Sequence, residues 1–287
     1  MLTLNPIEKR SGLNREIFTA EYLHPHQPVV FTDLMDQWPA KTNWTIDNLK
    51  KNYGQLDVPV VSPNYSKPGK GYMEPEMHMS FGEYLTLLER GPMPYRIFLW
   101  NIFKYAPQMC EDFQIPDIMD GFFHDFPMMF FGGQGAITPM HYDIDMSHVF
   151  LNQIHGRKRV VLFSPEQSTF LYHLPYSVAS YVDINNPDYE KYPALAKAHG
   201  WETVLEPGET IFMPSGYWHY IEYVDGGYSI ALRANESYIR RAKGAILIAK
   251  HYVVDKGMNR IFGSRWREMK EFLAIKKAEH MLEDSEN

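Results

Sequence analysis

Gly135-Ala136-Ile137-Thr138-Pro139-Met140-His141-Tyr142-Asp143 is the stretch that decides how this chain is interpreted, because it places a histidine and an aspartate two positions apart. Residues i and i+2 of a β-strand point to the same side, so the side chains of His141 and Asp143 can face one point. A third metal-binding residue, His219, follows a Pro-Ser-Gly turn (214–216) and precedes a strand-like segment. Two imidazoles and one carboxylate leave open positions on an iron ion. We therefore predict a metal site of His141, Asp143 and His219.

Two nearby residues compete for the same roles. Asp145 falls on the same side of the expected strand as Asp143, and His148 is the only other histidine close to the motif. A His-X-Asp pattern alone also occurs by chance, and a buried histidine is often a packed core residue. The choice of ligands therefore depends on the rest of the sequence.

A lysine and a threonine add an expected anion site. Lys158 stands at the entry to the apolar segment 160–163, and burying a lysine is costly unless an anion meets it. The distal carboxylate of 2-oxoglutarate would be such an anion, and Thr138 could add a hydroxyl donor. Arg157 and Arg159 flank Lys158 and are expected to point to solvent by strand alternation.

Outward from this motif, short apolar runs alternate with Gly and Pro turns between residues 126 and 235. Many short strands at close spacing indicate a β-sandwich or barrel. The runs lie at residues 128–131, 149–151, 160–163, 210–213 and 228–231.

The flanking segments have different patterns. Residues 1–125 are expected to form α/β elements packed on the core, with helices at 45–53 and 80–88 capped by Thr45 and Ser80. Residues 236–287 are expected to be helical, with apolar stripes that begin at Ile239 and Ile261. These helices either pack on their own barrel or pair two chains.

Composition limits the function classes. Hydrophobic residues make up 45% of the 287 residues, so a large core can form. The net charge of −7 disfavours a general nucleic-acid binder, although a local basic groove is compatible with it. Cys110 is the only cysteine, so multi-cysteine zinc modules are excluded and a reducing compartment is indicated. No apolar stretch is long enough to cross a membrane, and we expect a cytoplasmic protein with no membrane partner.

Four blocks of sequence resemble a known family, the JmjC-type, cupin-like Fe(II)- and 2-oxoglutarate-dependent hydroxylases. The blocks follow one another in the family's order, and with weaker likeness near the N-terminus they cover about residues 20–235. Within the family, the chain is most similar to the asparaginyl hydroxylase that acts on hypoxia-inducible factor, and the tRNA wybutosine hydroxylase is similar over the same blocks. The four blocks are residues 135–143, 153–165, 182–193 and 205–219.

The resemblance implies a mainly β fold with a double-stranded β-helix (cupin or jelly-roll) core. It also implies Fe(II) held by His141, Asp143 and His219, and 2-oxoglutarate bound by Lys158 and Thr138. In the asparaginyl hydroxylase, helices after the barrel form a homodimer, so residues 236–287 are candidates for the same role.

This chain departs from the asparaginyl hydroxylase at three places. Phe98 stands where that enzyme places a tyrosine hydroxyl on 2-oxoglutarate, and Arg233 stands where it has an asparagine near the cosubstrate. We expect Arg233 to supply the missing contact to a carboxylate. Val178-Ala179 replaces the Arg and Gln that grip the substrate amide, which weakens the case for asparagine as the substrate.

The expected function is hydroxylation of a C–H bond on a protein or peptide side chain. The alternatives are a tRNA-base hydroxylase of the same fold and a non-catalytic cupin-like binding module. Tyr142 and Trp218 either wall the site or pack in the core. The loops 62–75 and 166–182 are expected to shape the substrate entrance, the second through Tyr172, Tyr176 and Tyr181.

Overall fold

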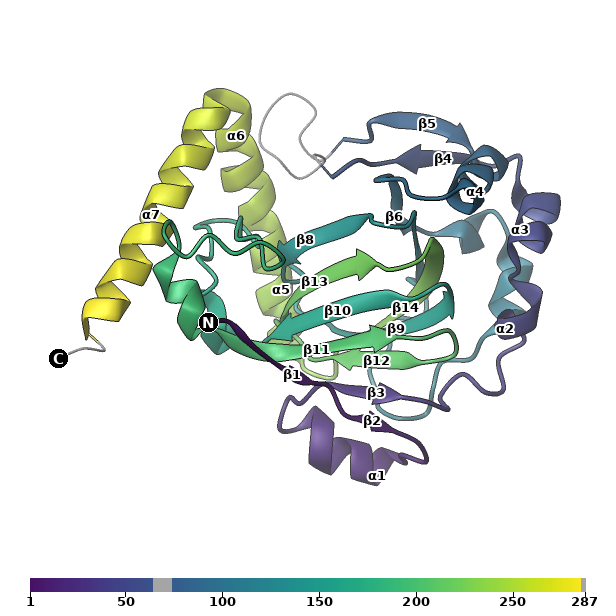
Figure 1. Cartoon of the computed structure of the whole chain (residues 1–287). Coiled ribbons are helices and arrows are strands. Elements are labelled where there is room, and N and C mark those ends of the chain that lie inside the picture. Colours follow the sequence, from purple (N-terminus) through teal and green to yellow (C-terminus); the bar gives the residue numbers. More distant parts are fainter. Residues whose placement is uncertain (64–73, 285–287) are drawn as a thin grey trace.

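Two β-sheets packed face to face form the core of the computed structural model, which describes residues 1–63 and 74–284 (Figure 1). The five-stranded sheet has the order β1-β11-β10-β13-β8, and the seven-stranded sheet has the order β2-β3-β12-β9-β14-β7-β6. The strands of the first sheet are β1 (Thr3–Pro6), β8 (Ile137–His141), β10 (Lys158–Phe163), β11 (His199–Leu205) and β13 (Trp218–Tyr223). Those of the second are β2 (Lys9–Arg10), β3 (Val29–Phe31), β6 (Arg96–Trp100), β7 (Met128–Gly132), β9 (His148–His155), β12 (Thr210–Met213) and β14 (Gly227–Ala234).

Strands β7 to β14 form the double-stranded β-helix that the resemblance implies. In chain order they fall mostly in alternate sheets, with β8, β10, β11 and β13 in one sheet and β7, β9, β12 and β14 in the other. The chain therefore crosses repeatedly between two facing sheets, as in a jelly roll. The prediction of a mainly β, cupin-type core is confirmed.

The alternation of side chains along the strands explains why the core strands have continuous apolar sequences. On β9, Val149 and Leu151 point between the sheets, while Phe150 points out to the N-terminal helices. Both faces of such a strand are covered, so its sequence is apolar throughout. The four strands β9, β10, β12 and β14 all contain runs of this kind.

The N-terminal segment does more than pack on the core. Its strands β1, β2, β3 and β6 are hydrogen-bonded members of the two sheets, and β4 (Asp57–Val60) pairs with β5 (Met77–Ser80) as a separate hairpin. The expected domain boundaries at residues 125 and 235 stay predictions.

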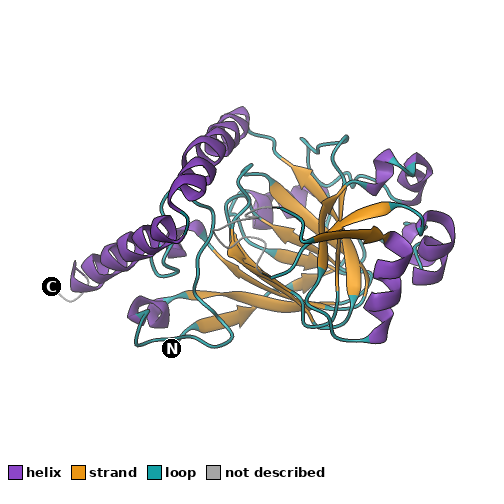
Figure 2. Cartoon of the chain, turned by 90° about the horizontal axis from the view of Figure 1, so that it is seen from above, coloured by secondary structure: helices purple, strands orange, loops and turns teal. Residues whose placement is uncertain are grey.

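The N-terminal helices pack on the outer face of the seven-stranded sheet, and helices lie at both ends of the sheets (Figure 2). The two expected N-terminal helices are present, because Thr45 caps α3 and Ser80 forms a capping box with Glu83 on α4. The N-terminal helices are α1 (Arg15–Phe18), the π-helical η1 (Thr19–Leu23), α2 (Ala40–Asn43), α3 (Ile46–Tyr53) and α4 (Phe81–Arg90). Short 3₁₀ segments are η2 (Ile102–Lys104), η3 (Pro107–Asp112), η4 (Pro165–Ser168) and η5 (Pro193–Lys197).

The C-terminal segment is helical, as expected, and lies on the side of the barrel opposite α2 to α4 (Figure 1). It consists of α5 (Tyr238–Lys250), the π-helical η6 (His251–Lys256), α6 (Gly257–Phe262) and α7 (Ser264–Asp284). Buried Ala274 and Ala278 pack α7 on the five-stranded sheet side. Among the described residues, no helix is both long enough and apolar enough to span a membrane.

Candidate metal and cosubstrate site

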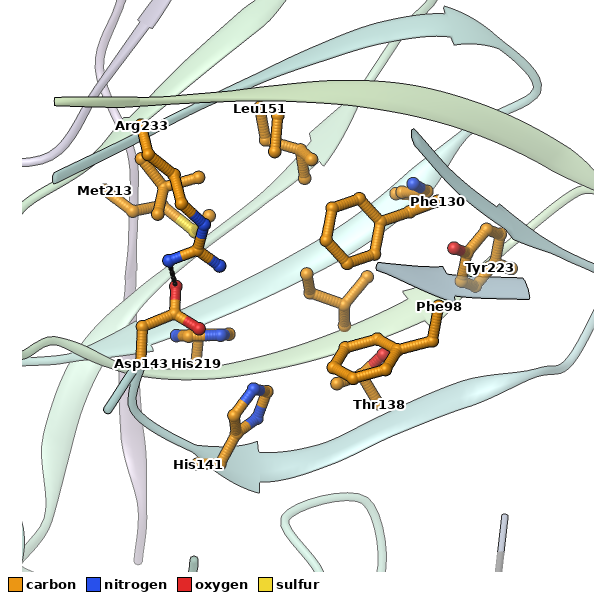
Figure 3. A pocket seen from close by; sticks show the side chains of 14 residues that line it. Phe98, Phe130, Thr138, His141, Asp143, Leu151, Met213, His219, Tyr223 and Arg233 are labelled. Carbon is orange, nitrogen blue, oxygen red and sulfur yellow. Dashed lines mark ion pairs between the residues drawn. The ribbon is translucent and has the colours of Figure 1, made fainter. Parts of the chain in front are cut away.

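The three predicted metal ligands lie together at one end of the barrel (Figure 3). Strands β8 and β13 are antiparallel neighbours, and their pairing sets His141 directly opposite His219. The centroids of the two imidazole rings are 4.2 Å apart. One ligand atom from each of His141, Asp143 and His219 lies within 4.8 Å of the others, which is close enough for all three to hold one ion.

The local geometry differs from the expected strand. Strand β8 ends at His141, so Asp143 is not a strand residue and the i, i+2 argument for it is wrong. The chain turns instead, with the backbone N–H of Met146 donating to the carbonyl of Asp143 at 3.2 Å and Met146 at φ 54°. This turn brings the Asp143 carboxylate back toward the two histidines.

Backbone carbonyls fix which nitrogen of each histidine faces the centre. Nδ1 of His141 lies 2.8 Å from the carbonyl oxygen of Pro139, and Nδ1 of His219 lies 3.2 Å from that of Tyr217. A carbonyl only accepts hydrogen bonds, so each Nδ1 carries the proton and each Nε2 is free to bind a metal. Burial, followed by the charge of His219, lowers the pKa of His141 to about 3, so this ring is neutral as a ligand requires.

Arg233 joins the site through the carboxylate of Asp143. Its Nη1 lies 3.0 Å from Asp143 Oδ2 and 3.1 Å from Asp145 Oδ1. Burial alone would raise the pKa of Asp143, but Arg233 and the two histidines together hold it below its usual value. Arg233 is thus placed beside the metal ligands, as the resemblance suggested, but it contacts acidic side chains.

The two competing residues lie outside this set. The Asp145 carboxylate accepts hydrogen bonds from the Ser147 hydroxyl at 3.0 Å and from Arg233. His148 is fully buried, and its Nδ1 accepts the backbone N–H of Ser215 at 3.1 Å. Neither belongs to the group of possible metal ligands found among the described residues.

Lys158 is buried at the first position of β10, as its sequence context predicted. Its side chain is 1% exposed, donates to the hydroxyl of Ser229 and lies 4.4 Å from the ring centroid of Tyr223. Burial, and then the charge of Arg96, hold the pKa of Lys158 well below its usual value. No ion pair to Lys158 is present in the described part of the chain, so an anion would relieve the cost of burying its charge.

The flanking arginines point outward, as expected. Arg157 pairs with Asp225 at 2.6 Å, and Arg159 pairs with Glu202 at 2.8 Å, both at the surface. Strand alternation therefore separates one inward lysine from two outward arginines.

A single pocket between the sheets joins the metal ligands to Lys158. Thr138 and Phe98 lie on its wall, and the Phe98 ring meets Phe130 edge-on with centroids 5.7 Å apart (Figure 3). Both predicted cosubstrate residues and Arg233 thus face the same space as the metal ligands. The lining residues are Phe98, Phe130, Thr138, His141, Asp143, Val149, Leu151, Lys158, Met213, His219, Ile221, Tyr223, Ala231 and Arg233.

Of the two roles left open for Tyr142 and Trp218, packing in the core is the one observed. Tyr142 and Trp218 pack against each other in the core, with ring centroids 4.9 Å apart, and neither lines the pocket. Tyr172 is buried, and its hydroxyl accepts the Ala194 N–H at 2.9 Å, so its expected role at the entrance is wrong. Of the other expected loop, residues 64–73 lie outside the described part of the chain.

Val178-Ala179, which stands in place of the residues that grip the substrate amide in the asparaginyl hydroxylase, lies beside the site. Ala179 forms a β-bridge with His141, and the carbonyl of Val178 accepts the N–H of Tyr142 at 3.0 Å. Next to this segment, Tyr176 stacks on Trp266 with centroids 5.8 Å apart. The C-terminal helices therefore contact a loop that borders the metal ligands.

Two pocket-side residues were missed by sequence reasoning. Arg96 is 2% exposed, and its Nη1 donates to the Thr138 hydroxyl at 2.6 Å. Tyr223 lines the pocket beneath Lys158. The signal for Arg96 was a charged residue at the start of an otherwise apolar strand, Arg96-Ile97-Phe98-Leu99-Trp100.

The donor set fits Fe(II), and the far end of the pocket fits a carboxylate. Two imidazoles and one carboxylate are the ligands that non-haem iron uses while keeping open positions. Fold and site together define a double-stranded β-helix protein with a candidate metal centre of two histidines and one carboxylate.

Comparison with known proteins agrees with this class. The family model described as "Cupin-like domain" matches residues 14–235. Lysine-specific demethylase 8 of Danio rerio is 30% identical over 226 residues, covering 75% of this chain and 55% of that protein. JmjC domain-containing protein D of Dictyostelium discoideum is 31% identical over 249 residues, covering 78% and 54%. tRNA wybutosine-synthesizing protein 5 of Gallus gallus is 30% identical over 227 residues, covering 72% and 70%.

The chain therefore belongs to the cupin-like (JmjC) domain family of Fe(II)- and 2-oxoglutarate-dependent oxygenases. It spans about half the length of the first of these relatives, the demethylase. The more specific likeness to the asparaginyl hydroxylase stays a prediction.

Proposed function

We propose that this protein is an Fe(II)- and 2-oxoglutarate-dependent oxygenase that hydroxylates a C–H bond, with a protein side chain as its substrate. The observation that carries the proposal is that the two histidines, Asp143 and Lys158 all face one pocket. With both groups bound, the reaction converts 2-oxoglutarate and O₂ to succinate and CO₂ and inserts one oxygen atom into the substrate.

The chain's own residues position the reactants. His141, Asp143 and His219 would hold the metal from one side, leaving the side toward the pocket open. Lys158 and Thr138 would bind the distal carboxylate of 2-oxoglutarate, and Arg233 would keep Asp143 ionised and oriented. Phe98 and Phe130 narrow the apolar part of the pocket and exclude water from it. A non-catalytic binding module would not need this complete set of ligands.

A protein substrate is supported by the relatives named lysine-specific demethylases and by the chain's acidic balance. Removal of a methyl group from lysine begins with hydroxylation of a C–H bond, so it falls within the proposed reaction. The net charge of −7 gives no general attraction to phosphate.

One observation favours RNA as the second candidate. The similarity to tRNA wybutosine-synthesizing protein 5 covers 70% of that protein, and the helices bordering the site are strongly basic. Residues 238–267 contain one acidic residue, Asp255, and eight basic ones: Arg240, Arg241, Lys243, Lys250, Lys256, Arg260, Arg265 and Arg267.

Isotopic labelling decides between the two substrates. The iron-loaded protein is incubated with 2-oxoglutarate, heavy-isotope O₂ and a cell extract, and protein digests and nucleosides are then analysed by mass spectrometry. We expect the label in peptides, or the loss of a methyl group from lysine, and neither change with the Asp143→Ala protein. Label found only in a tRNA nucleoside would overturn the protein-substrate proposal. A steep fall of tRNA affinity with rising salt would accompany that outcome.

We further propose that the C-terminal helices join two copies of the chain. The apolar stripe that begins at Ile239 does not pack on the barrel: Ile239 is 82% exposed, and Val253, farther along the same side, is 76% exposed. Such a stripe of apolar residues at three- and four-residue spacing is typical of a helix that pairs with another helix.

Val253→Glu is expected to convert a dimer into a monomer, because two copies would bury two like charges without partners. Val204→Glu is the matched control, since Val204 is an exposed valine of β11 (40%) far from these helices in the sequence. Light scattering after gel filtration measures the mass of each protein. A monomeric wild type, or a Val253→Glu protein that stays dimeric, would contradict the proposal.

A further inference from the structure

A second buried cation, Arg96, lies behind the pocket wall and reaches the pocket through Thr138. Arg96 enters from β6 in the seven-stranded sheet, and Lys158 enters from β10 in the five-stranded sheet. The two side chains are 2% and 1% exposed. Arg96 is close enough to contribute to the lowered pKa of Lys158. Burying the Lys158 ammonium near a second cation is costly, and a bound anion reduces that cost.

The hydrogen bond between Arg96 and Thr138 determines what the threonine can do. Arg96 Nη1 donates to Thr138 Oγ1 at 2.6 Å, and a guanidinium has no acceptor. The oxygen of Thr138 therefore accepts, and its own hydroxyl hydrogen must point elsewhere. Thr138 lines the pocket, so that hydrogen is available to a ligand that accepts hydrogen bonds (Figure 3).

Tyr223 completes this end of the pocket. The Lys158 ammonium lies over one face of the Tyr223 ring, 4.4 Å from its centroid. The ring also packs closely on Gly132, where an added Cβ would lie 2.5 Å from a ring atom. Gly132 is in turn the strand partner of Arg96. The arginine, the tyrosine and the lysine are thus held in fixed relative positions by paired strands.

We propose that Arg96 is a positioning residue that sets the specificity of this site for a dicarboxylic 2-oxo acid: it turns the Thr138 hydroxyl toward the distal carboxylate and adds a second positive charge beside Lys158. The inference rests on the proposed function. The inference also explains how the site can work with Phe98, which has no hydroxyl. The Thr138 hydroxyl, held in place by Arg96, supplies a hydrogen-bond donor to the distal carboxylate instead.

The test compares two cosubstrates that differ only at the distal end. The protein is loaded with Zn²⁺, which binds without turnover, and titrated with 2-oxoglutarate or with pyruvate by calorimetry. Pyruvate shares the 2-oxo acid group but lacks the distal carboxylate. Arg96→Met is expected to weaken 2-oxoglutarate binding about ten- to a hundredfold, as for a lost hydrogen bond involving a charged group, and to leave pyruvate binding unchanged. Arg96→Lys is expected to recover part of the loss, since it keeps the charge.

Thr138→Val provides a second variant that keeps Arg96 and the shape of the site. It is expected to lower the preference for 2-oxoglutarate in the same direction. The Arg96→Met/Thr138→Val double variant should lose less than the product of the two single effects, because one residue acts through the other.

Each outcome decides the proposal. Equal losses for both cosubstrates, or effects of Arg96 and Thr138 that multiply independently, would assign Arg96 a purely structural role. Wild-type protein that binds pyruvate and 2-oxoglutarate equally would overturn both this inference and the proposed cosubstrate. Wild-type preference for 2-oxoglutarate that persists in Arg96→Met and in Thr138→Val would overturn the inference alone.

Discussion

Asp143→Ala is expected to abolish turnover and to weaken metal binding at least about a hundredfold, since changing even residues that only support metal ligands costs ten- to a hundredfold. Two effects act in the same direction. The variant removes the only carboxylate in the group of three ligands, and it leaves Arg233 beside the two histidines with one of its two aspartate partners gone. A divalent cation would then meet repulsion in place of attraction.

Asp145→Ala is the matched control. Asp145 is also a carboxylate held by Arg233, with 3.1 Å between Arg233 Nη1 and Asp145 Oδ1, but it is not among the ligands. We expect it to change metal affinity less than about tenfold. Equilibrium dialysis with Fe(II) under anaerobic conditions measures both variants, and circular dichroism checks that each is folded. A fully active Asp143→Ala protein beside an inactive Asp145→Ala protein would reassign the ligand.

The parts of the fold that could be predicted from the sequence are the strands that are buried on both faces. Strands β9, β10, β12 and β14 are continuous apolar runs because the opposite sheet covers one face, and helices or, for β10, the loop that follows it cover the other. Strand β6 was not recognised, because its sequence mixes a charged residue and exposed Leu99 with apolar ones. Its pairing with β7 across many residues of chain is a tertiary contact that local pattern does not reveal.

The same reason separates the site residues that were predicted from those that were missed. Lys158 could be singled out because a lysine opening a buried strand is unusual in itself. Arg96 also opens a strand, but β6 was not recognised as one, and the contact of Arg96 with Thr138, 42 residues away in the chain, is a tertiary contact. Tyr172 was misassigned because a tyrosine in a loop has the same sequence pattern whether its ring is buried or exposed.

The pairing of Arg233 with two aspartates also needed the structure. From sequence, an arginine near a cosubstrate site suggests a contact to a carboxylate of the ligand. In the structure, the carboxylates that Arg233 meets belong to Asp143 and Asp145. A direct contact between Arg233 and 2-oxoglutarate therefore stays a prediction, and orientation of Asp143 is the role that the contacts support.

Lys158→Ala is expected to weaken 2-oxoglutarate binding by two to three decades while metal affinity stays unchanged. Removing one partner of a buried charge pair costs about 3–5 kcal/mol, because the other charge remains in a site that water does not reach. Lys158 is 1% exposed, so solvent screening does not reduce this cost.

Arg157→Ala and Arg159→Ala are the matched controls, since they remove a charge immediately before and after Lys158. Both arginines form surface ion pairs, which are typically worth about 0–1 kcal/mol, so their loss should change 2-oxoglutarate affinity little. Equal effects of all three substitutions would indicate a diffuse basic patch instead of a specific anion site.

The stability of the protein without ligand gives an independent check on Lys158. Burial disfavours the charged amine, so its presence costs folding free energy until an anion binds. Lys158→Met, which keeps the volume of the side chain and removes the amine, is therefore expected to leave the ligand-free Tm unchanged or higher, while 2-oxoglutarate no longer raises it. A Lys158→Met protein with a ligand-free Tm well below that of the wild type would show that Lys158 stabilises the folded protein. A residue whose role is to bind an anion stabilises only the ligand-bound state.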